Sequence, residues 1–517
     1  MRQAGCLIPL FSVRSTNGWG LGEIPDLVPF ARWARASGFS VVQVLPVHET
    51  SRGQSSPYSA LTAFALDPVY AAIDALEDFQ AAGGRDALSP EEQEELAALQ
   101  GVPAVSWPRV RDLKGRALRL AFESFLDAEW KRHSERAQKL EQYAREHASW
   151  LDDYALFVTL HDLQGGQAWT AWEGPLRDRE PSALAAARGA HSGEILFQVW
   201  QQWQLDLQWH AARRACNDEG VELMGDLPFM VAGDSADVWS RPFDFRMDAR
   251  VGVPPDQYSE TGQDWGLPVY RWDRMAKNGF AFMNERARRT GELYDLYRVD
   301  HVVGLYRTYY RELGETVGAF TPPDEPGQQK NGEKMLTLLA QGARVVAEDL
   351  GVIPDFVRAS LRRLRVPGYR VLRWEKDGAV YRDPAKWPAV SLGTTGTHDT
   401  DALADWFEGL AAAERAELLK IPGLSRLREP APERFSAEVR DALLELVYRS
   451  GSDLVLLPFQ DAFGSRERVN VPGTVTESNW SYRMPLTLSA LMNDLPTQRR
   501  LRALAEKSGR LAPATRS

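Results

Sequence analysis

Carboxylate side chains follow several short apolar runs in this chain, and their types suit acid–base chemistry. Asp226 ends the run "VELMGD", and Asp300 follows "LYDLYRV". Glu348 comes directly after "RVVA", and Asp399 lies in the Gly/Thr-rich segment "GTTGTHD". If the runs are parallel strands, their carboxyl ends meet at one edge of the fold. Asp300, Glu348 and Asp399 would then converge there.

Three interpretations account for such a convergence. The carboxylates could bind a metal ion, or they could form structural ion pairs with Arg298. Alternatively, two carboxyl groups about 5–5.5 Å apart could carry out glycosyl transfer with retention of configuration. A metal site is the least attractive, because no His-x-x-His, Cys-x-x-Cys or Asp-x-Asp-x-Asp-Gly pattern supports it. We therefore expect no metal.

The neighbours of each carboxylate predict its role. Arg298 lies two positions before Asp300, so on a strand both side chains point to the same face. The cation would keep Asp300 ionised, as a nucleophile requires. The apolar strand before Glu348 would desolvate its carboxyl group and raise its pKa, which suits a general acid/base. Asp349 points to the opposite face, where a cap or a salt bridge is expected.

The turn around Asp399 suits hydrogen bonds to sugar hydroxyl groups. Two histidines stand next to these carboxylates, His301 after Asp300 and His398 before Asp399. Both would donate hydrogen bonds to the same sugar.

These side chains need a scaffold that brings distant parts of the chain together. Eight short runs rich in β-branched residues recur along the sequence, and helical patterns lie between most of them. The runs are 6–10, 40–47, 221–229, 293–301, 343–351, 368–374, 389–399 and 452–461. This alternation is typical of an α/β fold and predicts a (β/α)8 TIM barrel. A doubly wound sheet remains the alternative.

The second and third runs are separated by far more chain than one crossover needs, and that stretch is rich in helical patterns. We predict large, mainly helical insertions between strands 2 and 3 and at later loops. Residues 1–75 would form the first part of the barrel with strands 1 and 2, and 76–215 a mainly helical insertion subdomain. Residues 216–517 would form the rest of the barrel, strands 3–8, with a lid loop at about 251–275. "SETGQDWGLPVYRWD" reads as loop because Gly, Pro and Asp recur in it.

Composition excludes several classes of protein. The chain has 517 residues, a formal charge of −10 and a pI near 5.5, which argues against a nucleic-acid partner. Cys6 and Cys216 cannot form a disulfide framework. No run approaches the about 20 apolar residues of a membrane span. With no secretory segment near Met1, a cytoplasmic protein is expected.

The motifs, taken as a set, resemble those of the amylomaltases, the 4-α-glucanotransferases of the α-amylase superfamily. The resemblance extends from the N-terminus to about residue 485 and is weakest in the helical insertion. "SSPYSALTAFALDPVY" and "GDLPFMVAGDSADVW" resemble family motifs of the second and third strands. "GVPPDQYSETGQDWGLPVYRW" is similar to the lid peculiar to the family and is the most discriminating stretch. "YRVDHVVGL", "AEDLGVIP" and "TGTHDTD" resemble its catalytic segments, and "VNVPGTVTESNWSYRM" resembles its closing segment.

The resemblance implies a role for each matching residue. Asp300 would be the nucleophile, Glu348 the acid/base and Asp399 the residue that stabilises the transition state. The sugar site next to the scissile bond would be lined by Tyr58, Asp226, Arg298, His301 and His398. Trp265 would belong to the lid, and Asn470 would contact the donor side.

The chain departs from the family at two places. Leu267 stands in the lid where many members have Asn, and "HVVGLYRTYY" replaces the commoner Phe-Arg after His301. Both changes affect subsite preference more plausibly than mechanism.

The activity that the resemblance implies is transfer of α-1,4-glucan segments by double displacement, which uses only carboxyl groups and needs no cofactor and no obligatory metal. Donors would be maltooligosaccharides, amylose, or glucans derived from starch or glycogen, and the acceptor would be the 4-hydroxyl of glucose or of another glucan. A lid around Tyr258 and Trp265 would exclude water. A hydrolase of the same superfamily would share the carboxylates without the lid segment. A non-catalytic carbohydrate-binding barrel would not need a buried nucleophile. The sequence makes no prediction of oligomeric state.

Overall fold

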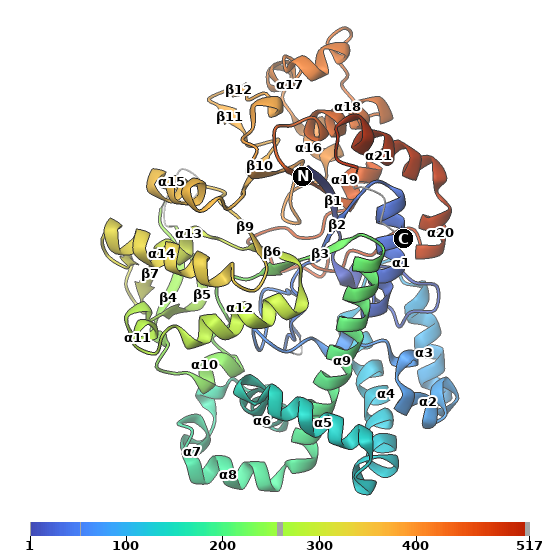
Figure 1. Ribbon diagram of the computed structural model, residues 1–517, viewed down its shortest axis with the longest axis vertical. Helices are drawn as coiled ribbons and strands as arrows, with labels where there is room; N and C mark the ends of the chain where they lie inside the picture. Colours follow the sequence, from blue (N-terminus) through green and yellow to red (C-terminus); the bar gives the residue numbers. More distant parts are fainter. Residues whose placement is uncertain (1, 52, 256–261, 512–517) are drawn as a thin grey trace.

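Eight parallel strands close into a barrel in a computed structural model that describes residues 2–51, 53–255 and 262–511 (Figure 1). Around the barrel the strand order is β1–β14–β13–β10–β9–β6–β3–β2. The strands are β1 (Gln3–Leu7), β2 (Val41–Gln43), β3 (Glu222–Leu227), β6 (Leu296–Val299), β9 (Arg344–Ala347), β10 (Gly368–Val371), β13 (Ser391–Thr394) and β14 (Leu454–Pro458). Each expected run overlaps one strand, and β1 pairs with both β2 and β14. The predicted (β/α)8 barrel is therefore confirmed, and an open doubly wound sheet is excluded.

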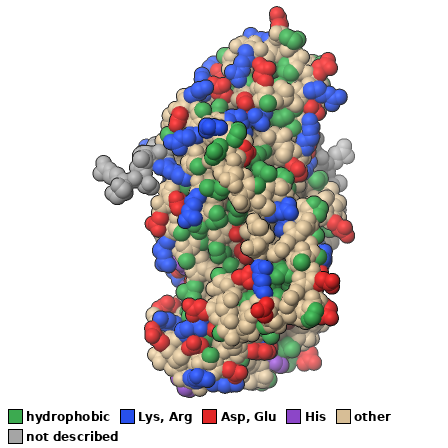
Figure 2. Space-filling model, turned by 90° about the vertical axis from the view of Figure 1, so that its right-hand side faces the viewer, with side chains coloured by type: hydrophobic (Ala, Val, Ile, Leu, Met, Phe, Trp, Pro, Cys, Tyr) green, Lys and Arg blue, Asp and Glu red, His purple; other side chains and the backbone are tan. Residues whose placement is uncertain are grey.

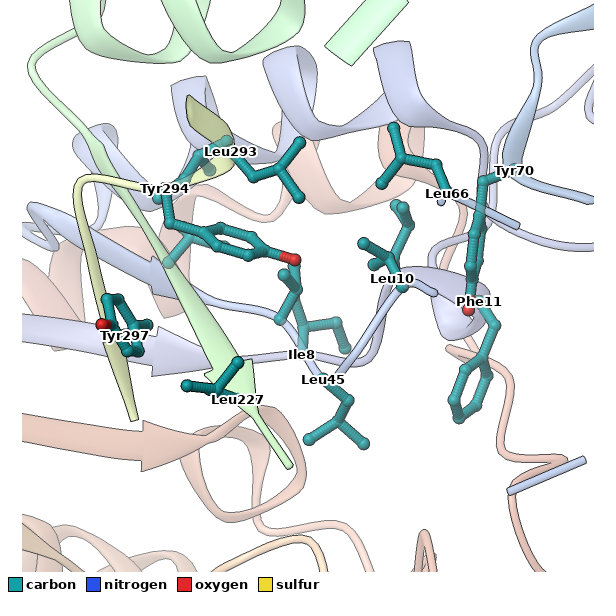
Figure 3. Close-up of a cluster of buried hydrophobic side chains, with 14 of the residues drawn as sticks. Ile8, Leu10, Phe11, Leu45, Leu66, Tyr70, Leu227, Leu293, Tyr294 and Tyr297 are labelled. Atoms are coloured by element: carbon teal, nitrogen blue, oxygen red, sulfur yellow. The ribbon is translucent and has the colours of Figure 1, made fainter. Parts of the chain in front are cut away.

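Successive side chains along each strand point alternately into and out of the barrel, so the buried residues form two separate hydrophobic cores. Inside the barrel, every strand contributes one or two buried side chains to a small cluster, such as Leu296 of β6 and Val346 of β9. Outside, a much larger cluster packs the strands against the helices (Figure 3), including Leu227, Leu293 and Tyr297. Because Tyr297 points outward, its neighbours Leu296 and Arg298 point inward.

Helices cover the outside of the barrel. They include α1 (Leu27–Ala36), α12 (Ala281–Leu293), α14 (Glu325–Leu339), α15 (Asp355–Leu364), α18 (Ala437–Tyr448) and α21 (Leu495–Lys507). Local sequence sets their ends: Asp324 accepts a hydrogen bond from the Gly327 N–H at the start of α14. Gly38, where a helix stop is expected, adopts φ +88° just beyond α1.

Between β2 and β3 the chain is mainly helical. The longer helices there are α3 (Pro90–Gly101), α4 (Trp107–Ala128), α5 (Glu135–Glu146), α6 (Ala148–Leu163), α8 (Pro181–Ala190) and α9 (Ser192–Asp218). They lie in the lower part of Figure 1. The last of them, α9, packs against α6 and also against α1 and α12 of the barrel. The division at 75 and 215 stays a prediction, and α9 runs through the second of these positions.

A second sheet lies beside the barrel, in the order β5–β4–β7–β8. Its antiparallel strands are β4 (Phe245–Val253), β5 (Gln263–Tyr270), β7 (Thr308–Glu312) and β8 (Ala319–Thr321). The prediction of loop for "SETGQDWGLPVYRWD" is wrong over residues 263–270. Gly and Pro did not prevent pairing, because β5 is an edge strand, which tolerates Pro268, and its register shifts opposite β4. Tyr258 lies outside the described residues.

Two further expectations bear on the class of protein. No helix within the described ranges is long and apolar enough to cross a membrane. Cys6 and Cys216 are both buried with free thiols. Figure 2 shows Lys and Arg side chains interspersed with Asp and Glu over the face that it presents.

Candidate active site

Arg298 is the centre of the charged groups at the carboxyl ends of the strands. It lies on β6 opposite Asp226 of β3. Its Nη1 donates to both carboxylate oxygens of Asp226 at 2.8 Å. Its Nη2 lies 2.6 Å from Asp300 Oδ1 and 3.9 Å from Glu348 Oε2. Burial acts against the charged guanidinium, but the carboxylates, Asp226 first, hold the pKa of Arg298 well above its usual value.

Asp300 and Glu348 differ in their access to solvent. Asp300 comes directly after β6 and its side chain is 28% exposed, whereas that of Glu348, directly after β9, is 11% exposed. Because β6 and β9 are neighbours, one guanidinium nitrogen reaches both carboxylates. Because Arg298 Nη2 lies 2.6 Å from Asp300 Oδ1 and 3.9 Å from Glu348 Oε2, these two distances together set an upper limit on the separation of the two oxygens. That spacing is compatible with the about 5–5.5 Å between carboxyl groups in retaining glycosyl transfer.

The carboxyl group of Glu348 is held by backbone donors in a dry environment. The His301 N–H donates to Oε2 at 2.8 Å, and the Leu350 N–H donates to Oε1 at 3.0 Å. Burial raises the pKa of Glu348 to about 7, although Arg298 acts in the opposite direction. The expected rise in this pKa is confirmed. A carboxyl group with that pKa supplies both its protonated and its ionised form near neutral pH.

A second row of side chains extends from Asp226 to the closing segment. The Tyr58 hydroxyl donates to Asp226 Oδ2 at 2.8 Å and lies 3.1 Å from His398 Nε2. The Tyr58 and His398 rings stack with centroids 5.4 Å apart. His398 Nε2 lies 3.3 Å from Asp399 Oδ2, and Asn470 Nδ2 donates to Asp399 Oδ1 at 2.6 Å. Two segments outside the barrel strands thus complete the site: the one that carries Tyr58, after β2, and the closing segment that carries Asn470, after β14.

His398 and Asp399 form an ion pair. Burial alone would raise the pKa of Asp399, but His398 and the Asn470 amide hold it below its usual value. Burial would lower the pKa of His398, but Asp399 raises it above its usual value. Each group therefore favours the charged form of the other.

The β4–β5 hairpin reaches the barrel mouth through Trp265. Its indole packs edge-on against His301, with ring centroids 4.8 Å apart and an interplanar angle of 76°. Phe229, just after β3, lies against the same imidazole at 5.7 Å. Burial lowers the pKa of His301 to about 4, so the ring is neutral at physiological pH.

The structure brings all ten sequence-predicted residues into one chain of contacts. Starting from the hairpin, it runs through Trp265, His301 and Glu348 to Arg298, which contacts both Asp300 and Asp226, and continues from Asp226 through Tyr58, His398, Asp399 and Asn470. Asp349 lies apart from this chain of contacts and accepts a hydrogen bond from the Tyr369 N–H at 2.7 Å. Its expected structural role is confirmed.

Besides Phe229 and Leu350, sequence reasoning missed Tyr369, Trp480 and Arg468, which also contact this network. The Arg298 guanidinium lies 6.0 Å from the centroid of the Tyr369 ring. Trp480 lies 5.7 Å from the Tyr58 ring and 5.8 Å from that of His398. Arg468 Nη2 donates to the Asp399 carbonyl at 2.7 Å. Two of them carried a usable signal, since Trp480 lies in the same closing segment as Asn470 and Arg468 stands two positions before Asn470.

A metal centre is not apparent in the part of the chain that the structure describes. No group of three or more His, Cys, Asp or Glu side chains there is placed to hold an ion. Between Asp226, Asp300 and Glu348 the positive charge is that of Arg298.

A closed (β/α)8 barrel with acidic side chains at the carboxyl ends of its strands defines the class of barrel enzymes. The sequence pattern of the 4-alpha-glucanotransferase family matches residues 8–488. The chain therefore belongs to the 4-alpha-glucanotransferase family, and its resemblance to that family is confirmed.

Curated relatives agree with this assignment, and a solved structure shares the fold. The 4-alpha-glucanotransferase of Thermus thermophilus is 33% identical over 93% of this chain and 94% of its own length. That of Chlamydia pneumoniae is 29% identical over 94% and 92%. An amylomaltase from Streptococcus agalactiae in complex with acarbose matches at a TM-score of 0.83 and 24% identity, over 99% of this chain and 100% of that one. The last comparison shows that the fold is shared.

Proposed function

We propose that this enzyme transfers α-1,4-glucan segments from a maltooligosaccharide or longer glucan to the 4-hydroxyl of glucose or another glucan. One observation carries the proposal: Arg298 lies against both Asp300, which solvent reaches, and Glu348, which is buried. A nucleophile must be ionised and accessible, and a general acid must keep its proton near neutral pH. The exposure of the two carboxyl groups differs in the direction that these roles require, because Asp300 is the more accessible and Glu348 the more buried.

In the first step Asp300 attacks the anomeric carbon as the glycosidic C–O bond breaks. Glu348 gives its proton to the departing oxygen, and a β-linked glycosyl ester on Asp300 results. In the second step the acceptor hydroxyl attacks the same carbon and gives its proton to Glu348. The ester bond breaks, Asp300 is released as a carboxylate, and the α configuration is restored.

The remaining side chains position the sugar and its developing charge. Asp399 is ionised beside His398, so it is suited to binding sugar hydroxyl groups and stabilising positive charge at the anomeric centre. Both carboxylate oxygens of Asp226 accept hydrogen bonds from Arg298, and Oδ2 also accepts one from the Tyr58 hydroxyl. We infer that it fixes Arg298, and that Tyr58 and His398 form a platform beneath the sugar.

Transfer requires that a sugar reach the intermediate before water does. Trp265 brings the edge strand β5 against His301 at the barrel mouth. We infer that this hairpin restricts water there and offers an apolar surface to the acceptor. A cytosolic location belongs to the same proposal and is supported by the two free, buried thiols.

Product analysis on maltotriose tests the proposal. We expect both glucose and chains longer than maltotriose, and isotopically labelled glucose should appear at the reducing ends of products. Asp300→Asn should abolish turnover while glucan binding is retained, which assigns the products to this site. Glucose and maltose without elongated chains would instead indicate a hydrolase. Binding without any turnover of the unaltered enzyme would indicate a non-catalytic barrel.

A further inference from the structure

His301 lies between the β4–β5 hairpin and the acid/base, and its backbone is unusual. It adopts φ +44°, in the left-handed region that residues other than Gly enter rarely. Such a conformation persists only where the surroundings hold it. The residue directly follows Asp300, so a relaxation at His301 would be felt in the site itself.

The left-handed conformation has a definite consequence for Glu348. It directs the His301 N–H to Glu348 Oε2 at 2.8 Å, while the next N–H, that of Val302, donates to the Glu348 carbonyl at 3.1 Å. A further bond closes the turn, from the Gly304 N–H to the His301 carbonyl at 2.9 Å. Because the Val302 and Gly304 N–H groups hold the chain after His301, an ordinary φ at His301 would rotate the preceding peptide and turn its N–H away from the carboxyl group.

Two aromatic rings from other elements hold the imidazole in place. Trp265 of β5 packs on it edge-on at 4.8 Å, and Phe229 lies against it at 5.7 Å. Phe229 is itself tethered, because its carbonyl accepts hydrogen bonds from Tyr270 and Arg286. Trp265 is different, since it comes from the edge strand of the second sheet and its indole N–H donates to Gln263 of the same strand. Phe229 also reaches β5, because Tyr270 is the last residue of that strand, but of the two rings only Trp265 comes from the hairpin itself.

We propose that Trp265 is a positioning residue for the acid/base: by packing on His301 it keeps the His301 N–H on Glu348, and so couples the β4–β5 hairpin to proton transfer. The inference rests on the proposed function and adds to it a role for the hairpin beyond excluding water. The charged groups facing Glu348 are Arg298 and Asp300, and its second backbone donor is Leu350.

The sign of the effect follows from the chemistry of the bond. An N–H that donates to a carboxylate stabilises the ionised form, so its loss raises the pKa of the carboxyl group. Because the first step needs protonated Glu348, kcat/KM falls as pH rises through this pKa. Loss of the His301 N–H should therefore move the alkaline limb of kcat/KM to higher pH, by about one unit for one backbone donor.

A matched pair of variants at His301 separates backbone from side chain. His301→Gly and His301→Val both remove the imidazole, but Gly adopts positive φ readily and a β-branched residue does not. We expect the alkaline limb to stay near its original pH in His301→Gly and to rise by about one unit in His301→Val. If kcat/KM declined at the same alkaline pH in the two variants, the inference would be overturned.

Variants of Trp265 test the hairpin directly. Trp265→Ala should raise the alkaline limb in the same way, and Trp265→Phe, which keeps an aromatic contact, should restore it. A residue that only binds substrate would lower kcat/KM without moving the limb, and that result would contradict the coupling.

A measurement without turnover keeps the coupling separate from the proposed function. The carboxyl band of Glu348, identified in infrared difference spectra against Glu348→Gln, should titrate at higher pH in Trp265→Ala and His301→Val. If the unaltered enzyme forms no elongated products, the proposed function fails while this titration still decides the coupling. An unchanged titration would overturn the coupling alone.

Discussion

At the scale of single residues, one guanidinium organises the candidate site. Arg298 uses one nitrogen for both oxygens of Asp226 and the other for Asp300 and Glu348. A lysine has a single charged nitrogen and could not reproduce this fork. Burial then distinguishes the carboxyl groups, because Glu348 is largely shielded from solvent while Asp300 remains accessible.

The pKa of Glu348 predicts a pH dependence. Burial raises this pKa to about 7, and the first step needs the protonated form, so kcat/KM on maltotriose should decline as pH increases past about 7. A maltosyl fluoride donor should lack this decline, because fluoride departs without a proton. Steady-state rates with both donors between about pH 5 and 9 would check it. The same decline with the fluoride would show that another group is responsible.

At the scale of elements, the closing segment after β14 is fastened to the turn that carries Asp399. Arg468 Nε donates to the Asn470 carbonyl and Nη2 to the Asp399 carbonyl, each at 2.7 Å. The same guanidinium pairs with Asp401. This one side chain therefore positions both Asp399 and the amide that contacts it.

Replacing Arg468 should reduce catalysis more than binding. Arg468→Gln loses charge-assisted hydrogen bonds worth about 1.5–3 kcal/mol, so we expect kcat to fall about ten- to a hundredfold with little change in KM. Arg466→Gln is the matched control, since Arg466 lies in the same segment but pairs with Asp405 and Glu408 at the surface. It should stay within about twofold of the unaltered enzyme. Similar kcat values for the two variants would refute the role of Arg468.

At the scale of the whole molecule, a buried ion pair joins the helical segment to the start of the barrel. Lys114 of α4 is 1% exposed, lies 2.6 Å from Glu23 Oε1, and donates to the Val69 and Ala71 carbonyls at 2.8 and 2.7 Å. Burial raises the pKa of Glu23 to about 7, with Lys114 opposing the rise.

Lys114→Met should destabilise the protein by about 3–5 kcal/mol, because it leaves a buried carboxyl group without its partner. The loss should grow as pH rises past about 7, since the unaltered protein then folds with Glu23 ionised beside Lys114, whereas the variant must still take up a proton on Glu23 to fold. Thermal unfolding at several pH values would measure it. Adding Glu23→Gln should recover much of the loss, and Lys131→Met, at an exposed pair with Asp127, should change little. Equal midpoints for the Lys114 and Lys131 variants would contradict this account.

The barrel could be predicted from the sequence because each strand is a short buried run that ends in polar residues. The environment of Glu348 could be predicted for the same reason, since "RVVA" had to be buried. The second sheet could not, because β5 contains Gly and Pro, which an edge strand tolerates and a central strand does not. The contacts of Tyr58 with Asp226 and of Arg468 with Asp399 join distant parts of the chain, and no local pattern records them.

The pairing of β1 with β14 has a consequence for synthesis. Gln3 lies beside Leu454, so β1 leaves the ribosome without a partner on that side until more than 400 further residues have followed. Asn470, which completes the contacts of Asp399, emerges later still. During synthesis the edge of β1 that will pair with β14 therefore stays unpaired, which favours slow folding and exposes the nascent chain to aggregation. Chaperone capture during translation is the protection that such a chain needs.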